Sequence, residues 1–123
     1  NMSLGELRKK PGMNGIISSK YTDFIEGDFQ GKAKLLKQRY NNFDFVWFDC
    51  GGNAEYKKFI DEYWDICSDY IFFHFTYSDG KPNKRHDIIL NNIKDNPFIF
   101  DIVEPHKSIQ GSITMVRKRN EII

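Results

Sequence analysis

An acid and an imidazole follow two successive apolar runs of this chain, and their side chains are suited to proton transfer. Asp49 directly follows the run from Phe43 to Phe48, and His74 lies at the end of the next apolar run. A carboxylate beside an imidazole can orient it as a general base that deprotonates an acceptor hydroxyl. The alternative is structural: Asp49 caps the turn at Gly51 and Gly52, and His74 is a polar strand end.

The elements around these two side chains form a strand, a helix and a second strand. The sequence predicts a strand over Phe43 to Phe48, a helix over about Asn53 to Ser68 and a strand over Ile71 to Phe75. Two apolar strands joined by a helix suit a parallel sheet with helices on both faces. In such sheets ligands bind beyond the carboxyl ends of the strands, where Asp49 and His74 would lie.

The predicted helix after the first strand has the clearest periodicity. Its apolar side chains recur at spacings of three and four and build one face, which consists of Tyr56, Phe59, Ile60, Tyr63, Trp64 and Cys67. We expect both tryptophans, Trp47 and Trp64, in the core. His86 and His106 lie in polar context, and we expect both to be solvated.

Weaker patterns predict the other elements. These are an arm over 1–20 with at most a short helix near Leu4 to Lys9, a β-prone segment from Thr22 to Glu26, helices over Gly31 to Tyr40 and around His86 to Lys94, a polar loop from Ser78 to Arg85, and strands over Phe98 to Val103 and Ser112 to Arg117. The last two strands are too close for a crossover helix, so an antiparallel hairpin is expected. The α/β domain would span 21–123.

Size and charge restrict the function classes. A chain of 123 residues is long enough for one domain and too short for two. A net charge of +1 favours neither nucleic acid nor an anionic membrane as partner. The longest apolar runs are below the roughly 20 residues of a membrane span, and the first ten residues do not resemble a secretory signal.

The cysteine content also bears on the function class. Two cysteines, Cys50 and Cys67, make neither a disulfide framework nor a zinc site, so a cytoplasmic protein is expected. Cys50 has no base beside it in the sequence, which argues against a catalytic thiol.

Two stretches carry a resemblance to a known family. FIEGDF, at Phe24 to Phe29, and FDFVWFDCGGNAEYKKFIDEYW, from Phe43, occur in the order helix, β, α, β, α, β, β, with an antiparallel final strand. This resembles the C-terminal half of class I S-adenosylmethionine-dependent methyltransferases, closest to the small-molecule O-methyltransferase branch that includes catechol O-methyltransferase. The resemblance covers roughly Tyr21 to Arg119. It implies a Rossmann-like fold with three parallel strands, helices on both faces and a C-terminal antiparallel hairpin.

The resemblance also implies a binding site for the cofactor. Gly27, Asp28 and Gln30 stand where the family contacts the adenine of S-adenosylmethionine, and Asp49 stands at the end of the family's fourth strand. The alternative is a simple strand-to-helix turn capped by Asp28. Asp49 matches a cation-binding acid of the metal-dependent branch. Its expected oxygen partners are replaced by His74 and Phe75, so no metal is expected.

Two family features have no counterpart here. The glycine-rich loop after the first strand, which cradles the methionine part of the cofactor, and the acid that binds the ribose are both missing from the pattern. The expected function is methyl transfer from S-adenosylmethionine to a small-molecule acceptor, at an oxygen. The alternatives are a non-catalytic or partial chain that acts by partner binding or as a homodimer completing its sheet, and a nucleotide-binding Rossmann-like module.

Overall fold

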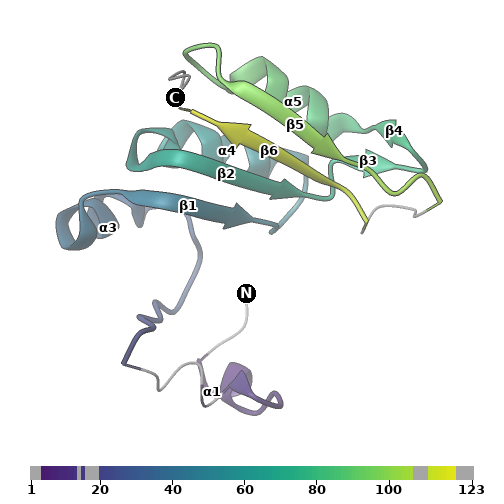
Figure 1. Cartoon of the computed structure of the whole chain (residues 1–123). Helices are drawn as coiled ribbons and strands as arrows, with labels where there is room; N and C mark the ends of the chain where they lie inside the picture. Colours follow the sequence, from purple (N-terminus) through teal and green to yellow (C-terminus); the bar gives the residue numbers. More distant parts are fainter. Residues whose placement is uncertain (1–3, 14, 16–19, 107–110, 119–123) are drawn as a thin grey trace.

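A four-stranded sheet forms the centre of the protein. The computed structural model describes residues 4–13, 15, 20–106 and 111–118. The sheet has the order β1-β2-β6-β5 (Figure 1), and its strands are β1 (Phe43–Phe48), β2 (Cys67–His74), β5 (Phe98–Ile102) and β6 (Ile113–Arg117). A separate two-stranded ribbon pairs β3 (Tyr77–Ser78) with β4 (Lys81–Pro82).

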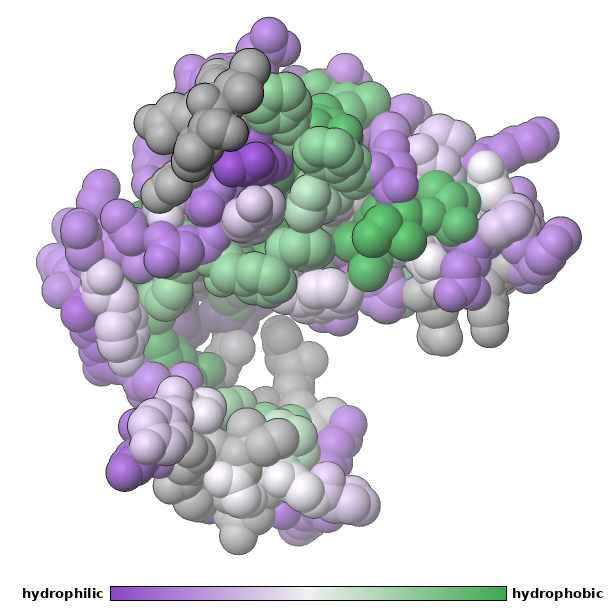
Figure 2. All heavy atoms as spheres, viewed as in Figure 1, coloured by the Kyte–Doolittle hydropathy of each residue, from purple (hydrophilic) through white to green (hydrophobic). Residues whose placement is uncertain are grey.

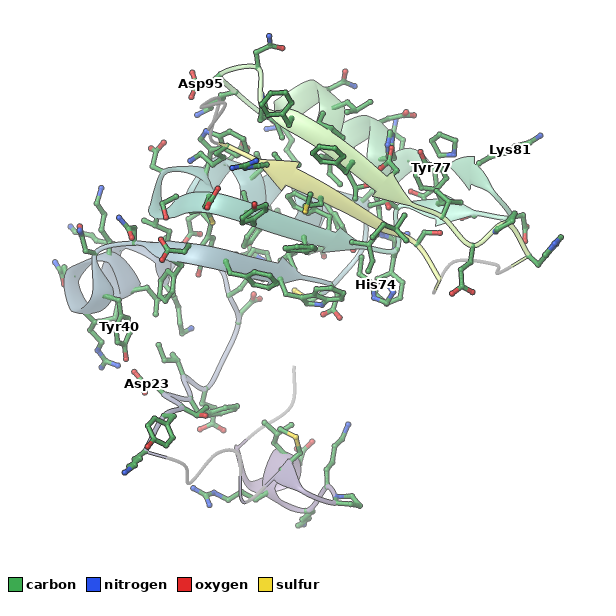
Figure 3. All side chains as sticks on the ribbon, viewed as in Figure 1. Asp23, Tyr40, His74, Tyr77, Lys81 and Asp95 are labelled. Atoms are coloured by element: carbon green, nitrogen blue, oxygen red, sulfur yellow. The ribbon has the colours of Figure 1, made fainter. Side chains whose placement is uncertain are left out.

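The strand directions make this a mixed sheet. β1 and β2 are parallel, and β6 is antiparallel to both of its neighbours, β2 and β5. The predicted C-terminal hairpin is therefore confirmed, and β1, β2 and β5 run in the same direction. The predicted strand from Thr22 to Glu26 is wrong: these residues have no strand structure. They pair with no strand of the described chain. The Asp23 carboxylate accepts a hydrogen bond from the Tyr40 hydroxyl of α3 (Figure 3).

Helices α4 (Asn53–Tyr63) and α5 (Lys84–Asn92) lie together on one face of the sheet (Figure 1). A single 3-10 turn, Trp64–Ile66, links α4 to β2. Helix α3 (Ala33–Tyr40) lies near the start of β1, and the short α1 (Leu4–Arg8) lies away from the sheet. Parts of the predicted N-terminal arm (1–3, 14 and 16–19) lie outside the described residues. No helix of the described ranges has the length and apolar character needed to cross a membrane.

The core lies between the sheet and the two helices. All six residues of the predicted helix face are buried, and the four that lie in α4, Tyr56, Phe59, Ile60 and Tyr63, confirm the 3.6-residue periodicity. The predicted extension of this helix to Ser68 is wrong, because Trp64 lies in the 3-10 turn and Cys67 is the first residue of β2. Phe48 of β1 and Phe73 of β2 pack on this face, with Phe48 stacked on Phe59 at 4.2 Å between ring centroids. Trp64 is 2% exposed, as predicted, whereas Trp47 is 46% exposed, so its predicted core position is wrong.

The second face of the sheet has no helix over it in the described part of the chain (Figure 1). Large side chains that point away from α4 and α5 remain about half exposed, among them Phe45, Phe100 and Ile102. The prediction of helices on both faces is therefore not confirmed. What is shown is a mixed α/β fold with helices α4 and α5 on one face.

Several element boundaries differ from the prediction for local reasons. β2 begins at Cys67, four residues earlier than predicted. It ends at His74, because Phe75 adopts a left-handed conformation (φ 64°) that cannot continue a strand. α5 begins two residues earlier than predicted, because the Asn83 side chain caps it by accepting hydrogen bonds from the backbone N–H of Arg85 and His86. The predicted polar loop thus holds the β3–β4 ribbon and the start of α5.

Candidate functional site

A cavity of about 490 Å³ runs along β1 at its open edge. Its walls come from β1 and the residues after it, from α4, the 3-10 turn and the start of β2, and from α3 and the chain before it. The lining residues are Ile25, Gly27, Asp28, Phe29, Lys32, Leu36, Phe43, Phe45, Val46, Trp47, Phe48, Asp49, Cys50, Phe59, Tyr63, Ile66 and Cys67. The lining is mostly apolar and aromatic, with two acids and one lysine. Small-molecule sites commonly have this size and composition.

Helix α4 holds the outer wall of the cavity in place. The Glu62 carboxylate accepts hydrogen bonds from the backbone N–H of Gly31 (2.8 Å) and Ala33 (2.9 Å) at the N-terminus of α3. A carboxylate is favourable there because of the positive end of the helix dipole. The Tyr63 hydroxyl donates to the Phe29 carbonyl, and the Phe29 ring packs edge-on against Phe48 at 5.2 Å. The segment from 27 to 33 is therefore tied to the core.

Of the three residues matched to adenine contact, two line the cavity. Gly27 and Asp28 are part of the wall, while Gln30 is not among the lining residues. The Gln30 backbone N–H donates to Asp28 Oδ1 at 3.2 Å, and Lys32 Nζ donates to the Asp28 carbonyl at 2.7 Å. Asp28 therefore closes a local turn, as the structural alternative predicts, but it does not cap α3. Gly27 has φ +112°, a conformation that favours glycine.

The structure brings Asp49 and His74 together at the carboxyl ends of β1 and β2. His74 Nδ1 lies 3.8 Å from Asp49 Oδ2, within ion-pair distance and beyond a hydrogen bond. Asp49 Oδ2 accepts a hydrogen bond from Trp47 Nε1 at 3.0 Å. The ring centroids of His74 and Trp47 are 5.6 Å apart. Figure 3 shows the His74 side chain at the end of β2. Asp49 lines the cavity, and His74 stands beside it without lining it.

Acidic groups gather at this end of the cavity. Partial desolvation raises the pKa of the Cys50 thiol, and the nearby carboxylates of Asp28, Asp49 and Glu55 raise it further. A thiol held in its protonated form is a poor nucleophile, which agrees with the expectation that Cys50 is not catalytic. Among the described residues, no group of three or more His, Cys, Asp or Glu side chains could hold a metal ion.

A second polar cluster lies between β5, β6 and α5, and sequence reasoning missed it. Its centre is Asp101, whose carboxylate lies 3.1 Å from His86 Nε2 and accepts from the Thr114 hydroxyl at 2.6 Å and the Tyr77 hydroxyl at 2.9 Å. The hydroxyl groups of Thr114 and Thr76 are 2.9 Å apart, and both residues are fully buried. We call these five residues the Asp101 cluster.

The position of His86 corrects the sequence analysis. His86 is 7% exposed, not solvated, because it lies three residues before the fully buried Ile89 on the inner face of α5. The i, i+3 spacing of the two residues was the available signal. Burial raises the pKa of Tyr77 to about 12, and its hydrogen bond to Asp101 adds to the shift. The Tyr77 hydroxyl therefore keeps its proton, and with it the hydrogen bond to Asp101, to a more alkaline pH than an exposed tyrosine would.

Comparison with known proteins adds no assignment. No protein-family model, no curated protein and no solved structure gives a significant match to this chain.

Proposed function

We propose that the cavity along β1 binds S-adenosylmethionine and that the protein serves methyl transfer to an oxygen of a small-molecule acceptor. The observation that carries the proposal is the convergence of Gly27, Asp28 and Asp49 on one cavity. Asp49 is more than 20 positions from the adjacent pair Gly27 and Asp28 in the chain, and the resemblance to methyltransferases assigns all three to the cofactor. The cavity volume of about 490 Å³ lies within the range of small-molecule sites.

The chemistry of the lining suits this cofactor. S-adenosylmethionine combines a flat adenine, hydroxyl and amine donors and a sulfonium cation. Aromatic walls such as Phe29 and Phe45 suit the adenine, and the carboxylates of Asp28 and Asp49 can accept hydrogen bonds and stabilise a positive charge. The same acids would repel a polyphosphate, which weighs against the nucleotide-binding alternative.

The sheet supports the proposal in a second way. The resemblance implies a final strand that is antiparallel, and β6 is antiparallel to both β2 and β5. The described chain has no counterpart of the family's glycine-rich loop, so the methionine end of the cofactor lacks that family contact. Affinity would therefore come from the adenine side, near Gly27 and Asp28.

Asp49 and His74 are the residues placed to handle a proton. When bound, S-adenosylmethionine supplies an activated methyl group, and the acceptor oxygen must lose its proton as it becomes an ether. His74 is the group that would take this proton, with the Asp49 carboxylate 3.8 Å away to stabilise the resulting imidazolium. Trp47 holds the same carboxylate oxygen at 3.0 Å and so fixes the acid in place.

Calorimetric titration of the full chain with S-adenosylhomocysteine tests the binding proposal. We expect binding at one site, weakened about tenfold or more by Asp28→Ala, because that change removes a cavity acceptor. Asp61→Ala is the matched control, since Asp61 is an exposed acid of α4 outside the cavity. Circular dichroism of each variant verifies the fold. No binding by a folded sample, or equal affinity of the Asp28→Ala and Asp61→Ala variants, would contradict the proposal.

A second candidate is a partial methyltransferase-fold chain that acts through a protein partner. The observation that favours it is the uncovered apolar face of the sheet, where Phe45 is 61% exposed and Ile102 59%. The two candidates are not exclusive, because the cavity and the uncovered face share β1.

A further inference from the structure

The face of the sheet opposite α4 and α5 is almost entirely apolar. Because side chains alternate along a strand, the neighbours of the buried Phe48, Ile71, Phe73, Thr114 and Val116 point away from the helices. We call this surface the open face; it consists of Phe45, Trp47, Tyr70, Phe72, His74, Phe98, Phe100, Ile102, Ile113, Met115 and Arg117. Figure 2 shows apolar residues gathered over the sheet in this view.

The open face exposes enough apolar surface to serve as an interaction site. Phe45, Trp47, Phe98, Phe100 and Ile102 are between 44% and 61% exposed. A large aromatic side chain offers about 150–250 Å², so these five residues alone expose roughly 500 Å². The largest apolar patch of a typical soluble monomer is about 300–600 Å² and often serves a function, so a patch of this size is a candidate interaction surface. Two such faces in contact would bury about 1,000 Å² from these five side chains alone, and the remaining side chains of the face bring the total into the range of stable interfaces.

The charges of the open face favour an apolar partner. Of the residues that make up the open face, His74 and Arg117 are the two whose side chains can carry a charge near neutral pH. Arg117 is already engaged within the chain, 3.9 Å from the Asp69 carboxylate and 5.5 Å over the Tyr70 ring. No lysine belongs to the face, so it lacks the phosphate contacts that nucleic-acid binding requires. Covering it with an apolar surface would bury no unpaired charge.

The strand register makes the face complementary to itself. Phe45 and Phe98 occupy the same row across the sheet, on the outer strands β1 and β5, and Trp47 and Phe100 occupy the next row. A two-fold axis parallel to the strands exchanges β1 with β5 of a second copy. The aromatic side chains of β1 then face those of β5 in both rows. Sheets pack in this manner about 10 Å apart in sandwich folds.

We propose that two copies of this chain pack with their open faces in contact, which makes a helix–sheet–sheet–helix dimer. The symmetry is closed and isologous, so the association stops at two copies. This arrangement differs from a dimer that completes the sheet edge to edge. Phe45 and Trp47 belong both to the open face and to the cavity wall. The aromatic residues on β5 of the partner subunit would therefore lie beside the cavity.

Sedimentation velocity of the full chain over a range of concentrations tests the proposal. We expect a species of twice the 14.5 kDa chain mass. Phe45→Lys and Phe100→Lys should each raise the dimer dissociation constant about 100-fold or more, since each places two ammonium groups against apolar surface. Leu90→Lys is the matched control, because Leu90 is 44% exposed on α5, on the helix side of the molecule. Circular dichroism and thermal melting verify that each variant is folded.

The two variants also separate face contact from edge contact. β1 and β5 are at opposite edges of the sheet, so an edge dimer through β1 would respond to Phe45→Lys and ignore Phe100→Lys. That result would overturn the proposal, as would a monomer at every concentration. A dimer equally weakened by Leu90→Lys would overturn it as well.

Acrylamide quenching of tryptophan fluorescence gives an independent readout. Trp47 is 46% exposed on the open face, whereas Trp64 is 2% exposed in the core, so Trp47 dominates the quenching in a monomer. We expect weak quenching of the dimer and at least about twofold stronger quenching of the Phe100→Lys variant at the same concentration. Equal quenching of the dimer and this variant would contradict burial of the open face.

Discussion

Single carboxylates join distant segments of this chain. Glu62 of α4 caps α3 through two backbone N–H groups about 30 positions away. The Asp101 carboxylate accepts hydrogen bonds from Thr114 of β6, His86 of α5 and Tyr77, the first residue of β3. A half-buried carboxylate that accepts several hydrogen bonds replaces the water it loses, so burying it costs little. Residues of this kind fix the cavity wall and the α5 docking more than local propensity does.

The buried thiol of Cys67 should make stability depend on alkaline pH. Burial raises the pKa of this thiol from 9.0 to about 11. As pH rises, the thiol of the unfolded chain therefore loses its proton before that of the folded chain. The free energy of unfolding is unaffected by this thiol below pH 9 and falls as pH rises toward 11. Thermal melting between these limits should show the wild type losing about 2 kcal/mol more than Cys67→Ala. Parallel curves for the two proteins would contradict the burial of an ionisable thiol.

At the scale of elements, the turn between β1 and α4 determines where Asp49 points. The strand ends at Phe48, and Gly51 turns the chain with φ +75°. A Cβ at this position would lie 2.5 Å from Glu55 Cγ. The Arg85 guanidinium lies within 3.5 Å of the Gly51 carbonyl and over the Tyr56 ring, so α5 braces the same turn.

Gly51→Ala should therefore lower the free energy of unfolding by more than backbone strain alone would. Gly31 is the matched control, because it has φ +80° and no atom within 4 Å of an added Cβ. We expect Gly31→Ala to lose about 1 kcal/mol of unfolding free energy from the left-handed backbone, and Gly51→Ala to lose about 1–2 kcal/mol more from the contact with Glu55. Urea denaturation measures both. Equal losses would mean that Glu55 moves aside without cost.

At the scale of the whole molecule, the described residues give the sheet one covered face and two edges without a further strand. β2 and β6 each have neighbours on both sides, whereas β1 and β5 have one neighbour each. Unpaired edge strands and exposed apolar faces are both sites of association. Face contact between two copies would cover the apolar surface and leave both edges free.

Hydrogen exchange should report this pattern. In the full chain, the amides of β2 and β6 should exchange slowest, since they lie at the centre of the sheet. Along β1, amides that point to the free edge should exchange at least about tenfold faster than those bonded to β2. Residues 4–13 should exchange fastest. Uniformly slow exchange along β1 would indicate that a further strand pairs with this edge.

The sequence alone determined the features whose signals are local. Helical periodicity identified the buried face of α4, and the short connection before β6 predicted the hairpin. The two successive apolar strands predicted that Asp49 and His74 lie at the same end of a parallel sheet, and the two side chains are 3.8 Å apart. These inferences hold because the regular geometry of helices and strands makes the spacing of residues in the sequence determine which way their side chains point.

Tertiary structure decided which of these side chains pack against other elements and which remain exposed. Alternation along β1 separates Trp47 from Phe48, but it cannot say which of the two faces a helix covers; Trp47 proved to be on the uncovered one. His86 is buried only because α5 docks beside Asp101, a residue 15 positions away. The segment from Thr22 to Glu26 is β-prone, yet it is no strand, because none of the strands that the structure describes pairs with it. Burial and strand pairing each require two surfaces in contact, and the sequence of one segment specifies only one of these two surfaces.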